Sequence, residues 1–179
     1  APEFKTQVAS LYKNMPVDNI LQTNGATGAT MLALYALIEP DDHVISMYPT
    51  YQQLYDIPKS LGADVDLWEV EEDKGWLPDL DQLRRLIRPN TKMICINNAN
   101  NPTGALMDAA YLEELVAIAK EVDAYVFSDE VYRSFDQPAP SIVDLYAKGI
   151  SVNSLSKTYS IPGIRVGWVA SNTEVADIL

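Results

Sequence analysis

The sequence has few of the residues that form disulfides or hold metal ions. Cys95 is the only cysteine among 179 residues and His43 the only histidine, so no internal disulfide can form. A metal site would also lack its usual ligands, and we expect none. Cys95 lies in the apolar run 93–96, which predicts a buried strand rather than a reactive thiol. We expect His43, which follows two aspartates, to lie at the surface or to act as a cap.

Basic residues and long apolar runs are also scarce. Thirteen Lys and Arg residues stand against 25 Asp and Glu residues, which gives a formal net charge of −12. This charge would repel a phosphate backbone over most of the surface, so we expect no nucleic-acid partner. The longest apolar run, 31–38, is far shorter than the roughly 20 residues that span a bilayer, and no secretory signal is evident. With the single cysteine, these features predict a cytoplasmic protein without a membrane segment.

Strand-like and helix-like segments alternate along the chain. Apolar segments rich in branched residues, which predict strands, lie at 43–48, 64–70, 92–97, 124–128, 149–153 and 166–170. Segments with helical spacing lie at 26–38, 51–61, 80–87 and 108–122. The alternation predicts an α/β fold of three layers (α/β/α), with a mostly parallel central sheet between the helices. In such a fold, ligands bind beyond the carboxyl ends of the strands.

The sequence shows no internal boundary between folded units. It opens in a segment with helical character and stops in another, and no linker, repeat or low-complexity tract interrupts it. The hydrophobic share of 47% and the charged share of 21% are ordinary for a globular domain. We therefore expect residues 1–179 to form most of one domain of a longer protein.

Polar residues collect in the loops after three of the predicted strands, at 100–104, 128–132 and 154–157. In a parallel sheet, these loops lie at the same edge. A fourth segment, 24–28, has small residues at the start of an apolar helix, where free backbone N–H groups would stabilise an anion. Taken alone, such a segment is more often only a helix cap, and this one matches neither GxGxxG nor the Walker pattern.

Lys157 has unusual neighbours for a lysine in a loop. Ser154 and Ser156 precede it, and Arg165 follows eight residues later. A lone loop lysine is usually solvated, but hydroxyl and guanidinium groups around it are donors that phosphate binds.

Three motifs carry a family resemblance. The segment 154–157 (SLSK), followed by 163–167 (GIRVG), resembles the cofactor-lysine signature of class I/II aminotransferases, which are aspartate aminotransferase-like, fold-type I enzymes that depend on pyridoxal 5'-phosphate (PLP). The segments 101–104 (NPTG) and 129–132 (DEVY) match further family motifs in order and approximate spacing. The resemblance covers essentially the whole chain. It implies the PLP-binding large domain, with the family's N-terminal segment and C-terminal small domain absent.

The resemblance also implies a role for each residue at the cofactor ring. Lys157 forms a Schiff base with PLP and then moves a proton between the substrate Cα and C4′ as general base and acid. Asp129 faces the pyridine nitrogen and keeps it protonated. Tyr132 and Asn101 donate hydrogen bonds to the phenolic oxygen, while Val131 packs beneath the ring. From the residues alone, Asp129 can equally cap a turn, and the others can serve packing or turn chemistry.

Further residues are implied for the other ring face and the phosphate. Tyr51 falls where the family carries a stacking aromatic, although Tyr48 and Tyr55 leave open an aromatic cluster that serves only the core. The expected phosphate ligands are Gly25, Ala26, Thr27, Ser154, Ser156 and Arg165. Glu130 departs from the small residue often found between the family's Asp and Tyr, and we expect its side chain to point away from the ring.

Transamination is the function that the resemblance implies. An amino acid would pass its amino group through the Lys157 Schiff base to a 2-oxo acid in a ping-pong reaction, and the protein would be a homodimer. Two alternatives stay open. The same core serves PLP-dependent C–S lyases, decarboxylases and synthases, and it also occurs as a non-catalytic PLP-sensing domain of regulators. The substrates cannot be identified, because the family's carboxylate-binding arginine lies in a region that these residues do not represent.

Overall fold

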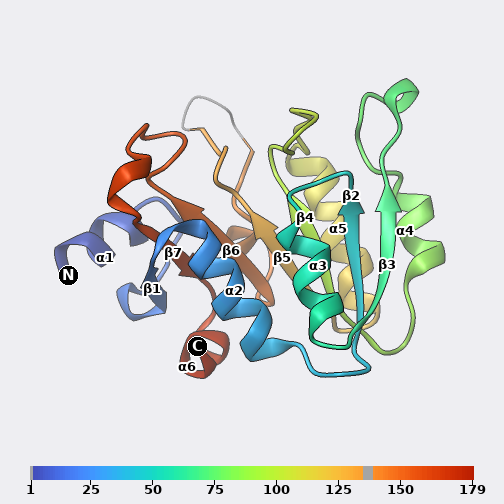
Figure 1. Ribbon diagram of the computed structural model, residues 1–179, viewed down its shortest axis with the longest axis horizontal. Helices are drawn as coiled ribbons and strands as arrows, with labels where there is room; N and C mark the ends of the chain where they lie inside the picture. Colours follow the sequence, from blue (N-terminus) through green and yellow to red (C-terminus); the bar gives the residue numbers. More distant parts are fainter. Residues whose placement is uncertain (1, 135–138) are drawn as a thin grey trace.

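A seven-stranded sheet runs through the computed structural model, which describes residues 2–134 and 139–179 (Figure 1). The strands are β1 (Ile20–Thr23), β2 (His43–Tyr48), β3 (Asp64–Glu69), β4 (Thr91–Asn97), β5 (Tyr125–Asp129), β6 (Gly149–Ser154) and β7 (Gly167–Ala170). Their spatial order is β1-β7-β6-β5-β4-β2-β3. Only β7 among these strands runs against its neighbours, so the other six share one direction. The prediction of a mostly parallel sheet is confirmed.

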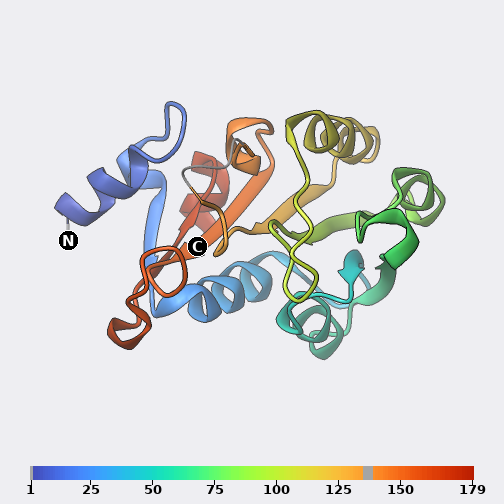
Figure 2. The same ribbon diagram turned by 90° about the horizontal axis from the view of Figure 1, so that it is seen from above.

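Helices cover both faces of this sheet, which confirms the three-layer α/β fold. The α-helices of the described residues are α1 (Pro2–Ala9), α2 (Gly25–Leu37), α3 (Gln53–Ser60), α4 (Leu80–Leu86), α5 (Ala109–Glu121) and α6 (Thr173–Ile178). Short 3-10 helices are η1 (Val17–Asn19), η2 (Glu72–Lys74), η3 (Ile142–Asp144) and η4 (Pro162–Ile164). Figure 2 shows α2 and α3 on one face and α1, α4 and α5 on the other. In this described part of the chain, no helix is long and apolar enough to cross a membrane.

The central strand β4 shows why its sequence is a continuous apolar run. Met93 and Cys95 join the hydrophobic core under α2 and α3, while Ile94 and Ile96 join the core under α4 and α5. Successive side chains of a strand point to opposite faces, and here both faces are covered. Cys95 is fully buried, as predicted, and burial raises the pKa of its thiol, so the group stays protonated.

One strand was missed by the sequence analysis. β1 has only four residues, too few for a reliable period-two pattern, and it pairs with β7 almost 150 residues away. The six predicted strands and four predicted helices are present, with ends shifted by at most two residues. Such shifts are ordinary at the ends of elements.

The prediction of a surface or capping role for His43 is wrong. Its side chain is fully buried at the start of β2, between the neighbouring strands β3 and β4. Its Nδ1 lies 2.7 Å from Thr91 Oγ1, and its Nε2 lies 3.1 Å from Asp66 Oδ2. Arg88 donates from Nη2 to the same Asp66 oxygen at 2.6 Å. The adjacent aspartates suggested exposure, but the partners come from strands that the local sequence does not reveal.

Candidate active site

A pocket of about 230 Å³ opens at the edge of the sheet where the six parallel strands end. It is lined by Ala26, Thr27, Tyr51, Asn97, Asn101, Asp129, Val131, Tyr132, Ser154, Ser156, Lys157, Pro162 and Arg165. Eleven of the twelve residues predicted for the site are among them. The twelfth, Gly25, lies directly beneath the Arg165 side chain. Residues spread over 140 positions of the chain thus meet in one pocket.

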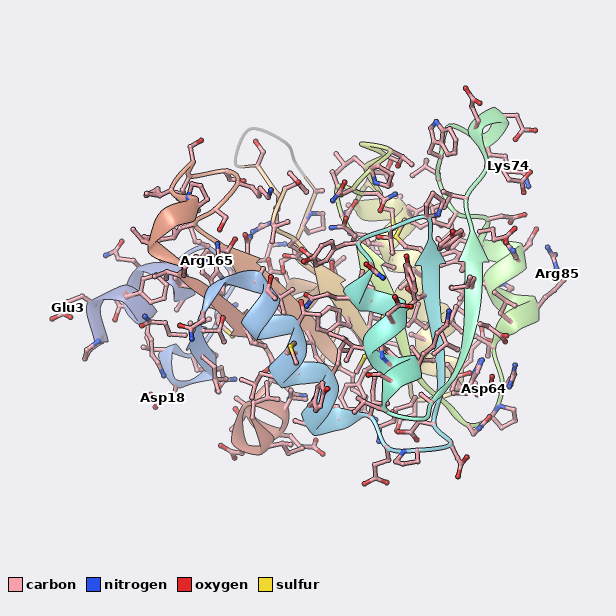
Figure 3. All side chains as sticks on the ribbon, viewed as in Figure 1. Glu3, Asp18, Asp64, Lys74, Arg85 and Arg165 are labelled. Carbon is pink, nitrogen blue, oxygen red and sulfur yellow. The ribbon has the colours of Figure 1, made fainter. Side chains whose placement is uncertain are left out.

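One end of the pocket combines a helix N-terminus with a guanidinium group. α2 begins at Gly25, and its N-cap residue is Asn24. The Asn24 side chain accepts no hydrogen bond from the N–H groups of the first helical turn. Gly25 has a φ of 72°, and a Cβ built on it would lie 2.7 Å from Arg165 Nη2. Figure 3 shows Arg165 beside this end of α2.

Arg165 brings an unpaired positive charge to this helix end. Its Nη1 donates to the carbonyl of Pro162 at 3.0 Å, but no carboxylate of the described residues forms an ion pair with it. A guanidinium and free helical N–H groups are the donors that bind a phosphate dianion. This end of the pocket therefore has the chemistry of an anion site.

The loop after β6 brings Lys157 into the lining of the pocket. The Lys157 Nζ lies 5.6 Å from the centre of the Tyr132 ring. Thr158 Oγ1 donates to the backbone carbonyl of Arg133 at 3.1 Å, which holds the lysine loop against the loop that follows β5. Ser154 and Ser156 line the pocket just before the lysine. The amine therefore shares the pocket with two serine hydroxyl groups and an aromatic phenol.

Asp129 forms the acidic end of the pocket. It is the last residue of β5 and only 2% exposed, and its Oδ1 accepts the backbone N–H of Val131 at 3.1 Å. Burial raises the pKa of Asp129 to about 7, and the charge of Glu130 adds to this, while the Val131 hydrogen bond and Lys157 act against it. No ion pair among the described residues includes Asp129. The residue caps a turn, and Lys157 acts on its carboxyl group through charge without forming an ion pair with it.

Asn97 is a pocket residue that the sequence analysis missed. It ends β4 directly beside Asp129 in the sheet, and its Nδ2 donates to the Asp129 carbonyl at 2.9 Å. Its Oδ1 accepts the backbone N–H of Asn101 at 2.7 Å, so Asn97 joins the loop after β4 to β5. We counted it only as the end of a strand. A polar residue at the last position of a buried parallel strand, the position that Asp129 also holds, was the available signal.

The tyrosines near Tyr51 resolve into two groups. The rings of Tyr48 and Tyr55 pack edge to face, with centroids 5.5 Å apart at an interplanar angle of 74°. Tyr51 lies outside this pair and lines the pocket. The aromatic cluster and the pocket aromatic are therefore different residues.

Glu130 points away from the pocket, as expected. Its side chain is buried, and its Oε1 accepts the backbone N–H of Ile142 at 2.9 Å. Its Oε2 accepts the hydroxyl of Ser151 at 2.8 Å. Burial raises the pKa of Glu130, and the Ile142 hydrogen bond opposes this. The Glu130 carboxylate thus binds η3 and β6 and does not line the pocket.

Comparisons with known proteins agree with this geometry. Residues 1–179 match the family model described as aminotransferase class I and II. The chain is 35% identical to the aspartate aminotransferase of Thermotoga maritima over 171 residues, 92% of this chain and 45% of that protein. It is 34% identical to the glutamate-pyruvate aminotransferase AlaA of Escherichia coli K12 over 168 residues, 89% of this chain and 41% of that protein.

A solved structure is similar over nearly the whole chain. The crystal structure of a PLP-dependent aminotransferase from Streptococcus suis 89-1591 has a TM-score of 0.98 and 71% identity, and it covers 99% of this chain and 48% of that one. The chain thus spans less than half the length of each of these relatives. Sequence motifs, sheet topology and family match together show that the chain belongs to the class I and II aminotransferases, with the fold of the type I PLP-dependent enzymes.

Proposed function

We propose that this chain is the PLP-binding large domain of an aminotransferase that moves an amino group from an amino acid to a 2-oxo acid. The observation that carries the proposal is the composition of one pocket: Lys157, Arg165 of the anion site and the buried acid Asp129 all line it. The names of the relatives, an aspartate and a glutamate-pyruvate aminotransferase, support this class of substrates. C–S lyases, decarboxylases, synthases and PLP-sensing domains use the same cofactor groups, but no feature of this pocket favours them.

The pocket fits PLP group by group. The unpaired guanidinium of Arg165 and the glycine on which it rests form a cradle for the phosphate, beside the α2 N-terminus. Asp129, which is buried and forms no ion pair with the described residues, suits a protonated ring nitrogen. The phosphate ligands would be Gly25, Ala26, Thr27, Ser154, Ser156 and Arg165. The ring would be held by Tyr51, Asn101, Asp129, Val131 and Tyr132, and its aldehyde by Lys157.

When bound, PLP supplies an electron sink that stabilises a carbanion at the substrate Cα. Lys157 Nζ would take the proton from Cα and return it to the cofactor, for which the amine must be able to become neutral. Asp129 would remain ionised beside the cationic ring nitrogen and keep the proton there. Tyr132 and Asn101 would donate to the phenolic oxygen, and the side chains of Tyr51 and Val131 would exclude water from the two ring faces.

The proposal extends to the protein as a whole. The full-length protein would be a homodimer, as the family resemblance implies, and cytoplasmic, as the composition indicates, with the substrate carboxylate bound outside residues 1–179. Its mass in solution, measured by light scattering, tests the dimer without reference to activity.

An absorbance titration of the full-length protein with PLP tests the function. We expect an absorbance band at about 400 nm for wild type that Lys157→Ala lacks, because the amine sets the electronic state of the bound cofactor. An amino acid substrate should convert this band to the pyridoxamine form and release its 2-oxo acid. A band that no amino acid alters would favour the PLP-sensing domain. Absence of any lysine-dependent band would contradict the proposal.

A further inference from the structure

Asn100 lies between two loops that carry pocket residues, although it does not line the pocket itself. It is 3% exposed. Its Nδ2 donates to the Pro49 carbonyl at 3.1 Å and to Thr103 Oγ1 at 2.9 Å, and its Oδ1 accepts the Thr50 hydroxyl at 2.9 Å. The first and last of these bonds cross to the loop between β2 and α3. One buried amide thus joins segments that are 50 residues apart.

The chemistry of these partners allows one orientation of the Asn100 amide. The Pro49 carbonyl can only accept a hydrogen bond, so the amide nitrogen must face it. The amide oxygen is then left to the Thr50 hydroxyl, which must donate. A flipped amide would set its oxygen against the Pro49 carbonyl oxygen and lose this cross-loop bond. The bonds therefore fix the relative placement of the two loops rather than only filling space.

The sheet itself does not provide this connection. Backbone pairing between β2 and β4 ends at Ser46 and Cys95, several residues before either loop reaches the pocket. Beyond that point, Thr50 immediately precedes Tyr51 in one loop and Asn100 immediately precedes Asn101 in the other. The hydrogen bond between Thr50 and Asn100 therefore joins the two residues that directly precede the pocket residues Tyr51 and Asn101.

We propose that Asn100 is a positioning residue that, through Thr50, sets the place of Tyr51 over the cofactor ring relative to Asn101. This inference rests on the proposed function, since it assigns Tyr51 to one ring face and Asn101 to the phenolic oxygen. The amide acts through its neighbours and does not touch the cofactor. Loss of the cross-loop bonds leaves the fold in place and releases the start of α3.

Asn98 offers a matched control in the same loop. It is 5% exposed, and both ends of its amide bind the Met107 backbone: Nδ2 donates to the carbonyl at 3.0 Å, and Oδ1 accepts the N–H at 2.8 Å. Asn98 and Asn100 are therefore similarly buried, with two and three side-chain hydrogen bonds respectively, but of the two only Asn100 bonds to the β2–α3 loop. Asn→Asp at either position preserves the shape and removes an amide donor to a carbonyl. A milder pair is Thr50→Val, which deletes the hydroxyl, and Thr50→Ser, which keeps it.

The first readout is hydrogen exchange in the full-length protein without PLP. The amides of Leu54 and Tyr55 donate to the carbonyls of Tyr51 and Gln52 at 3.0 and 3.3 Å, so they report on the first turn of α3. We expect faster exchange at these amides in Asn100→Asp and Thr50→Val. Thr50→Ser and Asn98→Asp should exchange there as wild type does. Equal acceleration by Asn98→Asp and Asn100→Asp would overturn the proposal, because it would show a general loosening of the loop.

The second readout is PLP affinity in a double-mutant cycle. Thr50→Val should weaken PLP binding roughly tenfold, the effect of one lost buried hydrogen bond at a placed side chain. In a Tyr51→Leu background the same change should have little further effect, because there is no stacking ring left to place. Purely additive losses would overturn the proposal. If wild type failed to bind PLP, the proposed function would fail, and the exchange experiment would still decide whether Asn100 joins the loops.

Discussion

The guanidinium of Arg165 rests on the α-carbon of Gly25, so closely that a Cβ built on the glycine would lie 2.7 Å from Nη2. The two residues are 140 positions apart, and they meet because β7 runs alongside the start of α2. The absence of a side chain at Gly25 thus lets the arginine approach the helix N-terminus. Its φ of 72° also favours glycine at this position.

Gly25→Ala should weaken binding at the anion site. The added methyl group displaces the guanidinium and strains the backbone, so we expect PLP affinity to fall by roughly tenfold or more, comparable to the loss of a charge-assisted hydrogen bond. Gly28→Ala is the matched control, because a Cβ there would meet only ordinary contacts at 3.6 and 3.8 Å. Titration with PLP and with inorganic phosphate measures both variants. Equal affinities for the two would show that the Gly25–Arg165 contact is not needed.

Asp129→Asn should change how stability depends on pH in the protein without PLP. The folded-state pKa of Asp129, about 7, lies above the ordinary aspartate value of 3.8, so its proton is bound more tightly in the folded state. The associated stability is fully present below the unfolded pKa and is lost as the pH rises towards 7. A pKa difference of one unit corresponds to about 1.4 kcal/mol. The loss in the free energy of unfolding can therefore be measured by urea unfolding at pH 4.5 and pH 8.

We expect Asp129→Asn to be less sensitive to pH over this range and more stable than wild type at pH 8. Saturating PLP should reverse the order at pH 8, because a cationic ring nitrogen stabilises the ionised carboxylate of the wild type. An unchanged slope in the variant would show that Asp129 does not titrate in this range.

Much of this fold follows from local sequence patterns. Continuous apolar runs such as 93–96 predict doubly covered strands, and the predicted site residues meet because parallel strands end at one edge. Lys157 and Asp129 were recognisable for this reason, together with their motifs. The sequence alone therefore predicts which residues carry the chemistry of the pocket, but not their geometry.

The features that were missed depend on contacts between distant segments. Asn97 looks like an ordinary strand end until the register places it beside Asp129. Similarly, His43 follows two aspartates but bonds to side chains of β3 and β4. The cross-loop bonds of Asn100 depend on the separation of two loops that only tertiary structure defines. No pattern within one segment carries this information.

His43→Leu should lower stability without affecting the pocket. The change removes a buried hydrogen bond to Thr91 and a partly buried one to Asp66, which predicts a loss of about 1–3 kcal/mol in the free energy of unfolding. Thr91 begins β4 and Asp66 lies in the first half of β3, and Figure 3 shows Asp64, which begins β3 and also pairs with Arg88, far from Arg165. Urea unfolding measures the loss, and PLP titration should give the wild-type affinity. A changed PLP affinity would contradict the separation of the two ends of the sheet.

Glu130→Gln should lower the pKa of Asp129, although Glu130 does not line the pocket. The charge of Glu130 is one of the causes that raise this pKa, although burial is the larger one. The amide keeps the shape of the side chain: its oxygen can accept the Ile142 N–H, and its nitrogen can donate to Ser151, whose hydroxyl both donates and accepts. The fold should therefore tolerate the change better than Glu130→Ala, which leaves the Ile142 N–H unpaired.

The measurement is the pH at which stability without PLP stops falling, compared between Glu130→Gln and wild type. Because a lower folded pKa ends the loss at a lower pH, the variant should level off earlier as the pH rises. Glu130 itself also has a raised pKa and adds to the wild-type slope, so the double variant with Asp129→Asn separates the two contributions. If Glu130→Gln levelled off at the same pH as wild type, the two carboxylates would titrate independently, and the adjacent charge would have no part in setting the acidity of Asp129.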